Sequence, residues 1–125
     1  MFTKKTIITL VVFILSFIFT SEIIAKNNGS IPKNFWGIWY SPEDCKVYKK
    51  TKSRLDSIIE IKAKEVDGWE DVCELVKINS SSSNTFSGIF SCAGEGETWK
   101  KSYTFSLKTG KLYTNQGHNG LIPCD

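Results

Sequence analysis

The feature that most constrains the fold is a ten-residue stretch in which large apolar and small or polar side chains alternate. Between residues 98 and 107 the odd positions carry Trp99, Tyr103, Phe105 and Leu107, and the even positions carry Thr, Ser or Lys. Lys101 is the one exception on the apolar side. A period of two places successive side chains on opposite faces, so the stretch predicts a β-strand with one buried face.

Further segments of this kind recur along the chain, separated by turn-forming residues. Six to eight short strands with short connections predict an all-β fold, a small antiparallel meander that closes into a barrel or a two-layer sandwich. Residues 58–66 alternate as one strand, and Asp67-Gly68 predicts a two-residue hairpin turn after it. Residues 45–57 are polar and basic, and they are compatible with a strand or a short helix.

All four cysteines lie after residue 25, at Cys45, Cys73, Cys92 and Cys124. An even number of cysteines in a small exported domain predicts two disulfides, here with three possible pairings. The spacings of 28, 19 and 32 residues include no C-x-x-C pair and match no zinc site. We therefore expect no metal and no cofactor.

The register of one predicted hairpin selects the pairing. Segments 72–78 and 85–92 flank a Ser- and Asn-rich tract, which is typical of a turn. A hairpin centred on that tract places Cys73 opposite Cys92 and keeps apolar residues on one face. Opposed residues in such a pair lie about 4.5 Å apart at Cα, which a disulfide tolerates. The other two cysteines then pair with each other and link the start of the domain to its end.

The first 25 residues have the pattern of a secretory signal peptide. Lys4 and Lys5 precede an apolar run of about 15 residues, and the small residue Ala25 suits a cleavage site. The alternative is an uncleaved anchor, but a membrane-spanning helix needs about 20 apolar residues. We expect a signal peptide at 1–25 and, after its cleavage, no transmembrane segment and a periplasmic or secreted protein.

The rest of the chain is expected to form a mobile leader at 26–34 and a single β domain at 35–125. The whole chain has 16 Lys and Arg against 13 Asp and Glu, and its net charge falls to about +2 once the predicted signal peptide is removed. A nucleic-acid binder neutralises many phosphates, so this small charge argues against that class.

Charge is nevertheless unevenly distributed. A basic run extends from Lys46 to Arg54, and an acidic run extends from Glu65 to Glu74 around Trp69. The basic run could contact lipid headgroups or an acidic polymer, and the acidic run could dock a cationic protein. The simpler interpretation is that both are solvated faces of a small sheet.

Two resemblances bear on the fold. Gly37-Ile38-Trp39 resembles the G-x-W that opens lipocalin-type barrels, in which the Trp closes one end. Over most of the domain the chain is similar to a loose group of small exported alphaproteobacterial proteins of unassigned function. The similar segments are 35–39, 70–73, 92–99 and 110–112. This resemblance implies a compartment and a fold, and no activity.

Six residues are candidates for ligand binding. Most of the tryptophans, at Trp36, Trp39, Trp69 and Trp99, are expected in the core. One or two of them would line a barrel mouth that holds a small apolar ligand. Glu95 and Glu97 flank a glycine, and paired carboxylates can hydrolyse glycosides when held about 5–9 Å apart.

A solvated turn is the simpler interpretation of Glu95 and Glu97. The single histidine, His118, lies in a Gly- and Asn-rich segment without a nucleophile motif beside it. No catalytic residue is therefore expected.

These features favour a small non-enzymatic β-barrel-like binding protein of the bacterial envelope, monomeric, with a small apolar ligand or an envelope protein as partner. One alternative is an inhibitor of a secreted lytic enzyme such as lysozyme, because lysozymes are often cationic and the acidic run would suit them. The second alternative is a glycan-acting envelope enzyme that uses Glu95 and Glu97.

Overall fold

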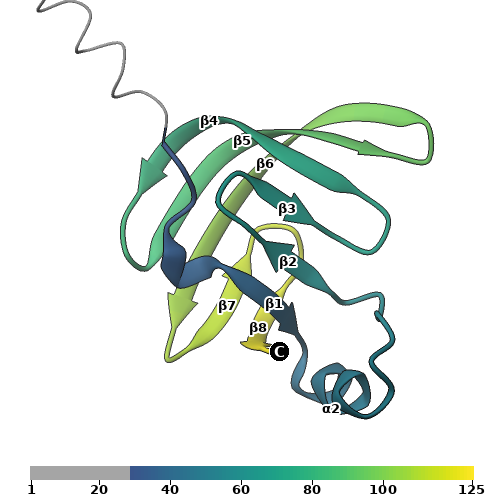
Figure 1. Ribbon diagram of the computed structural model, residues 1–125. Helices are drawn as coiled ribbons and strands as arrows, with labels where there is room; N and C mark the ends of the chain where they lie inside the picture. Colours follow the sequence, from purple (N-terminus) through teal and green to yellow (C-terminus); the bar gives the residue numbers. More distant parts are fainter. Residues whose placement is uncertain (1–28) are drawn as a thin grey trace, which may run out of the picture.

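The computed structural model describes residues 29–125, so the predicted signal peptide lies outside the described residues. Eight antiparallel strands form a closed barrel in chain order, and β8 pairs with β1 to complete it (Figure 1). The all-β prediction is confirmed, and the barrel rather than the sandwich is the architecture. The strands are β1 (Gly37–Tyr40), β2 (Ile59–Ile61), β3 (Glu65–Asp67), β4 (Val72–Ser81), β5 (Thr85–Gly94), β6 (Glu97–Lys108), β7 (Lys111–Thr114) and β8 (Asn119–Pro123).

Two predictions around β2 and β3 are wrong. The segment expected as one strand folds back on itself, because the Lys62 N–H donates to the Glu65 carbonyl at 2.8 Å and closes a turn between β2 and β3. Asp67-Gly68 does not form a two-residue turn either. Asp67 pairs with Val72, so four residues connect β3 and β4, and the Gly68 N–H donates to the Asp71 carbonyl at 3.0 Å.

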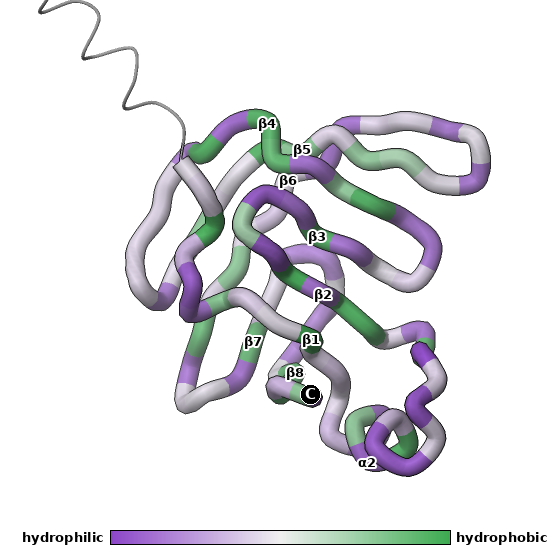
Figure 2. The backbone as a smooth tube through the Cα atoms, in the orientation of Figure 1, coloured by the Kyte–Doolittle hydropathy of each residue, from purple (hydrophilic) through white to green (hydrophobic). Residues whose placement is uncertain are grey.

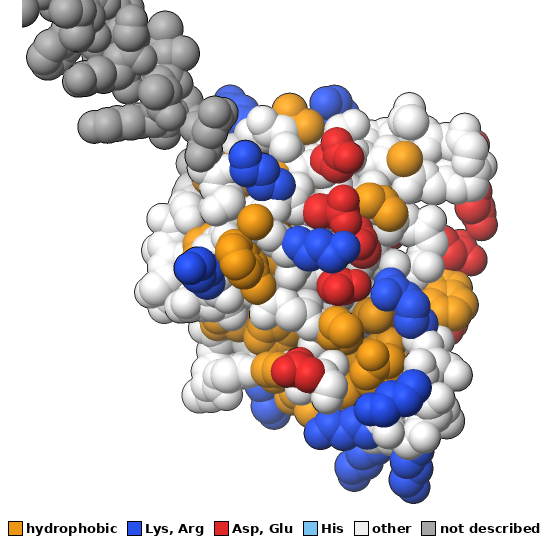
Figure 3. Space-filling model, in the orientation of Figure 1, with side chains coloured by type: hydrophobic (Ala, Val, Ile, Leu, Met, Phe, Trp, Pro, Cys, Tyr) orange, Lys and Arg blue, Asp and Glu red, His pale blue; other side chains and the backbone are white. Residues whose placement is uncertain are grey.

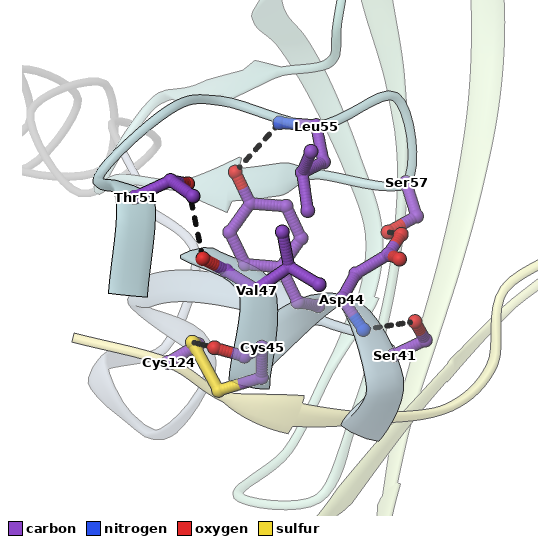
Figure 4. Close-up of a disulfide and its surroundings, with 9 residues drawn as sticks. Ser41, Asp44, Cys45, Val47, Thr51, Leu55, Ser57 and Cys124 are labelled. Carbon is purple, nitrogen blue, oxygen red and sulfur yellow. Dashed lines mark hydrogen bonds between the residues drawn. A yellow bond between two sulfur atoms is a disulfide. The ribbon is translucent and has the colours of Figure 1, made fainter. Parts of the chain in front are cut away.

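Of residues 45–57, left open between strand and helix, residues 45–51 are helical and residues 52–57 are not. Helix α2 (Pro42–Thr51) begins after Ser41, whose hydroxyl accepts from the Asp44 N–H at 3.2 Å (Figure 4). Proline in the first turn and acidic residues beside the helix N-terminus both favour this start. The helix ends where Lys52 adopts a left-handed conformation with φ of 60°.

Helix α2 lies against the outside of the barrel. Its Cys45 and Tyr48 pack with Tyr40 and Ile58 in a second, smaller cluster outside the main core. The hydroxyl of Tyr40, a fully buried residue, accepts from the Leu55 N–H at 3.1 Å and holds the segment that follows the helix.

Both predicted disulfides are present. Cys73 pairs directly with Cys92 across β4 and β5, with their Cα atoms 4.0 Å apart. Nearer the hairpin turn, two irregularities in β4 shift the register. The second disulfide joins Cys45 of α2 to Cys124 just after β8, with the Cα atoms 5.7 Å apart (Figure 4).

Side chains fill the barrel interior. The hydropathy of the chain alternates along the strands as expected for one inward face (Figure 2). Phe86 stacks on Phe105 at 5.8 Å between ring centroids, and Phe90 meets Tyr103 edge-on at 5.3 Å. The interior is thus a packed aromatic core.

One end of the barrel, here named the closed end, is covered by residues 29–36. Ile31 and Phe35 are fully buried there, and the 3₁₀ helix η1 (Lys33–Phe35) lies across it. The Trp39 indole N–H donates to the Phe35 carbonyl at 2.9 Å from inside. The packed domain therefore begins before residue 35, within the segment expected as a leader.

Candidate functional site

The opposite end of the barrel, here named the open end, is formed by the connections 41–58, 68–71, 95–96 and 115–118. Consecutive antiparallel strands reverse direction, so these alternate connections share one end. Two neighbouring cavities lie there, one of about 200 Å³ and one of about 230 Å³, and Asp71 lines both.

The first cavity leads into the barrel and is lined mostly by polar side chains. At its centre the Lys101 ammonium contacts a carboxylate oxygen of Asp71 at 3.1 Å, and each of the two side chains is 21% exposed. The same ammonium lies 5.3 Å from the Tyr103 ring centroid. The lining residues are Asp56, Ile58, Ile59, Gly68, Trp69, Asp71, Lys101, Tyr103, Gln116 and His118.

Position in the strand explains why a lysine lies here. Lys101 occupies an inward-facing position of β6, between Trp99 and Tyr103, and it is the exception that interrupts the apolar alternation. Near the closed end such a charge would be buried in the aromatic core. At the open end it reaches Asp71, which compensates its charge where it is only partly solvated.

The electrostatics leave one ion pair surrounded by neutral groups. Burial alone would lower the pKa of Lys101, but the Tyr103 oxygen and Asp71 outweigh it and raise that pKa above its usual value. Burial raises the pKa of Tyr103, so its hydroxyl keeps its proton. Burial, assisted by Lys101, lowers the pKa of His118. At neutral pH the cavity thus combines a fixed charge pair with an uncharged phenol and imidazole.

His118 is held in place from the loop side. Its Nδ1 lies 2.7 Å from the Thr114 hydroxyl, and the Thr114 N–H donates to the His118 carbonyl at 2.9 Å. The loop histidine of the sequence is therefore a fixed wall of the cavity.

The second cavity is bordered by carboxylates and one indole. Glu95 and Gly96 form a two-residue turn with φ of 50° and 79°, and Gly94 pairs with Glu97 across it. Repulsion from Glu95 raises the pKa of Glu70, which lies on the neighbouring loop. The lining residues are Glu70, Asp71, Gly94, Glu95, Glu97 and Trp99.

The structure divides the six candidate residues between the two ends. Glu95, Glu97, Trp99 and the 48% exposed Trp69 lie at the open end. The other two tryptophans belong to the closed end. There the indole of Trp36, which is 40% exposed, donates to the Ile31 carbonyl at 2.8 Å, and Trp39 is buried.

Among the residues that line the first cavity, only Trp69 was a candidate, and the polar groups of Asp71, Lys101, Tyr103 and His118 were missed. One signal in the sequence pointed to Lys101 and to a carboxylate beside it, because an uncompensated lysine on an apolar strand face requires a nearby carboxylate.

No protein-family model, curated protein or solved structure matches the chain. Within residues 29–125, no three His, Cys, Asp or Glu side chains are grouped so that they could hold a metal ion. No helix in this part of the chain is long and apolar enough to cross a membrane.

Proposed function

We propose that this chain is an exported, non-enzymatic binding protein that recognises a polar ligand, or a polar group of a larger partner, at the open end of its barrel. The observation that carries the proposal is the contrast between the two ends. The closed end is sealed by Ile31 and Phe35, whereas the open end keeps a partly buried ion pair and an exposed indole around a cavity.

The size and lining of the first cavity favour a small polar group as the ligand, instead of the apolar ligand expected from the sequence. Pockets for drug-sized molecules measure about 300–1,000 Å³, and the first cavity has about 200 Å³. A lipid chain would need the barrel interior, which aromatic side chains occupy. Lys101, Tyr103 and His118 instead offer polar contacts, and Trp69 offers an aromatic surface at the rim.

Export is supported by the two disulfides as well as by the signal pattern. Both bridges join cysteines that are almost completely buried, and such bridges form and persist in oxidising compartments. A periplasmic or secreted location remains part of the proposal.

The first test is a native mass spectrum of the protein, expressed with its own N-terminus and recovered from the periplasm. We expect a mass without residues 1–25, lowered by the hydrogens lost to two disulfides, and an additional mass from a retained polar ligand. A chain that retains residues 1–25 would contradict export, and the location would then have to be revised.

Two matched variants test the site itself. Trp69→Phe changes the rim of the open end, and Trp36→Phe changes a similarly exposed indole at the closed end. We expect the first variant to lose the retained ligand and the second to keep it. Equal retention by both variants would place the binding site elsewhere.

An inhibitor of a secreted lytic enzyme is the second candidate, favoured by the acidic rim. Glu70 and Glu95 repel each other next to Trp69, and a basic partner would relieve that repulsion. An exposed indole surrounded by polar groups is also the usual composition of a protein-binding hot spot.

The test of this second candidate is the lysis of cell walls by lysozyme in the presence of the purified domain. We expect Glu70→Gln with Glu95→Gln to reduce the inhibition, and Glu43→Gln with Glu74→Gln, which line neither cavity, to leave it unchanged. Lysis at the full rate in an excess of the wild-type domain would remove this candidate.

A further inference from the structure

Helix α2 carries a set of exposed cations that no contact within the described domain explains. They are Lys46, Lys49, Lys50 and Lys52, named here the lysine face. We propose that the lysine face docks on an anionic phospholipid surface. This proposal goes beyond the binding site at the open end, because none of its residues lines either cavity.

The packing of the helix determines which side chains are presented to solvent. Cys45 is bonded to Cys124, and Tyr48 packs with Tyr40, so this side of α2 faces the barrel. Lysines therefore project from the remaining sides, and the space-filling view shows basic side chains gathered around the helix (Figure 3). Val47 lies among them with 45% of its surface exposed.

These lysines have no acidic partners. The four ion pairs within residues 29–125 involve Arg54, Lys62 and Lys101, and none involves α2. Within residues 29–125, Lys52 forms no ion pair, and its ammonium lies 5.8 Å from the centroid of the Tyr48 ring. Glu43 lies one turn nearer the start of the helix and forms no ion pair with the lysines.

Helix stability does not account for the arrangement either. Cations near the end of a helix interact favourably with its dipole, which suits Lys49 and Lys50. Lys46, however, lies in the middle of the helix and four residues before Lys50, and like charges at this spacing disfavour a helix. The disulfide at Cys45 and the cap at Ser41 hold the helix in place against that repulsion.

Charge segregation favours a flat anionic surface as the partner. The whole chain has a net charge of only +3. Even so, four lysines gather on and directly after α2, whose own acidic residues are confined to its first turn, and a cluster of acidic side chains lies on β2 to β4 (Figure 3). Such a molecule is oriented by a negative surface, with the helix toward it. Lysines can then contact headgroups while Val47 contacts the interfacial region.

The experiment is co-sedimentation of the purified domain with phospholipid vesicles at low salt. One set of vesicles contains one-third phosphatidylglycerol in phosphatidylcholine, and the other contains phosphatidylcholine alone. Each lysine near an anionic surface contributes about a fivefold increase in partitioning. We expect binding to the anionic vesicles only, and its loss at about 0.5 M salt, where the Debye length is about 4 Å.

Two triple variants of equal net charge localise the effect. Lys46→Gln, Lys49→Gln and Lys50→Gln together should weaken partitioning about 100-fold. Lys77→Gln, Lys100→Gln and Lys111→Gln, all on strands of the barrel, should change it only a few-fold. All six positions are exposed, and equal thermal midpoints verify that both variants are folded.

Three outcomes would overturn the proposal: no binding of the wild type to anionic vesicles, equal binding to neutral vesicles, or an equal loss in the two triple variants. The last outcome would show a general effect of net charge. None of these results bears on the proposed binding site at the open end, because its variants are compared by the amount of ligand that they retain.

Discussion

Removal of the Cys45–Cys124 disulfide should destabilise the domain more than removal of Cys73–Cys92. The two bridges close segments with sequence separations of 79 and 19 residues. In the chain-entropy model, a bridge stabilises by restricting the unfolded chain, and its effect grows with the logarithm of the closed loop.

The magnitudes follow from the nesting of the two loops. With the inner bridge intact, the outer bridge closes an effective loop of about 60 residues and contributes about 4.3 kcal/mol. The inner bridge contributes about 3.2 kcal/mol. All four cysteines are at least 98% buried, so the packing lost on replacement by alanine is similar for both pairs. Removal of the outer bridge should therefore lower the free energy of unfolding by about 1 kcal/mol more than removal of the inner bridge.

Urea unfolding at equilibrium measures the difference directly. The samples are the wild type, Cys45→Ala with Cys124→Ala, and Cys73→Ala with Cys92→Ala, all in the oxidised state. An equal loss in the two variants, or a greater loss for the inner pair, would refute the loop-length reasoning. It would assign the stabilisation to contacts in the native barrel.

Three further perturbations test single features. Tyr40→Phe leaves the Leu55 N–H without its acceptor, so urea unfolding should show a loss of about 1–2 kcal/mol, and a loss below about 0.3 would exclude that role. Gly96→Ala places a side chain at φ of 79° and should lower the free energy of unfolding by about 1 kcal/mol. An unchanged free energy of unfolding would show that the turn does not need a glycine at this position. In the folded state, burial and the charge of Lys101 lower the pKa of His118 below its ordinary value of 6.5. As the pH falls below about 6.5, the imidazole therefore gains a proton in the unfolded chain before it does so in the folded chain. The stability that the neutral imidazole contributes is lost over this pH range. Urea midpoints at about pH 7.5 and 5.5 should therefore differ less in His118→Asn than in the wild type, and equal differences would contradict the burial of the imidazole.

The all-β meander and its disulfides were predictable because they follow from local alternation, which left the choice between a barrel and a two-layer sandwich open. The register that places Cys73 opposite Cys92 depends only on a period of two and on the tract between the strands. Closure of the outer bridge then follows by elimination. The register fails nearer the turn, where the irregularities in β4 leave no trace in the alternation.

Helix α2 was left open for a different reason. A ten-residue helix that packs only Cys45 and Tyr48 against the barrel has too few apolar positions to show a helical period. Its start was nevertheless encoded, since Ser41-Pro42-Glu43-Asp44 has the composition of a helix N-terminus.

The open end was only partly predictable. Trp69, Glu95 and Glu97 could be selected by residue type, whereas the contact between Lys101 and Asp71 joins residues 30 positions apart. The successive pairing of β4, β5 and β6 brings them together, and the sequence shows only that Lys101 needs a partner. His118 joins them from a third segment, without a motif that would mark it.

The position of Cys124 imposes an order on how the domain matures. A chain that emerges from its N-terminus presents Cys73 and Cys92 well before β8, and this inner bridge can form while the barrel is still incomplete. Cys45 must stay reduced until β8 has emerged and paired with β1, because its partner follows that last strand. A premature bond from Cys45 to either inner cysteine would trap the chain, so an isomerase or a delay in oxidation would raise the yield of native protein.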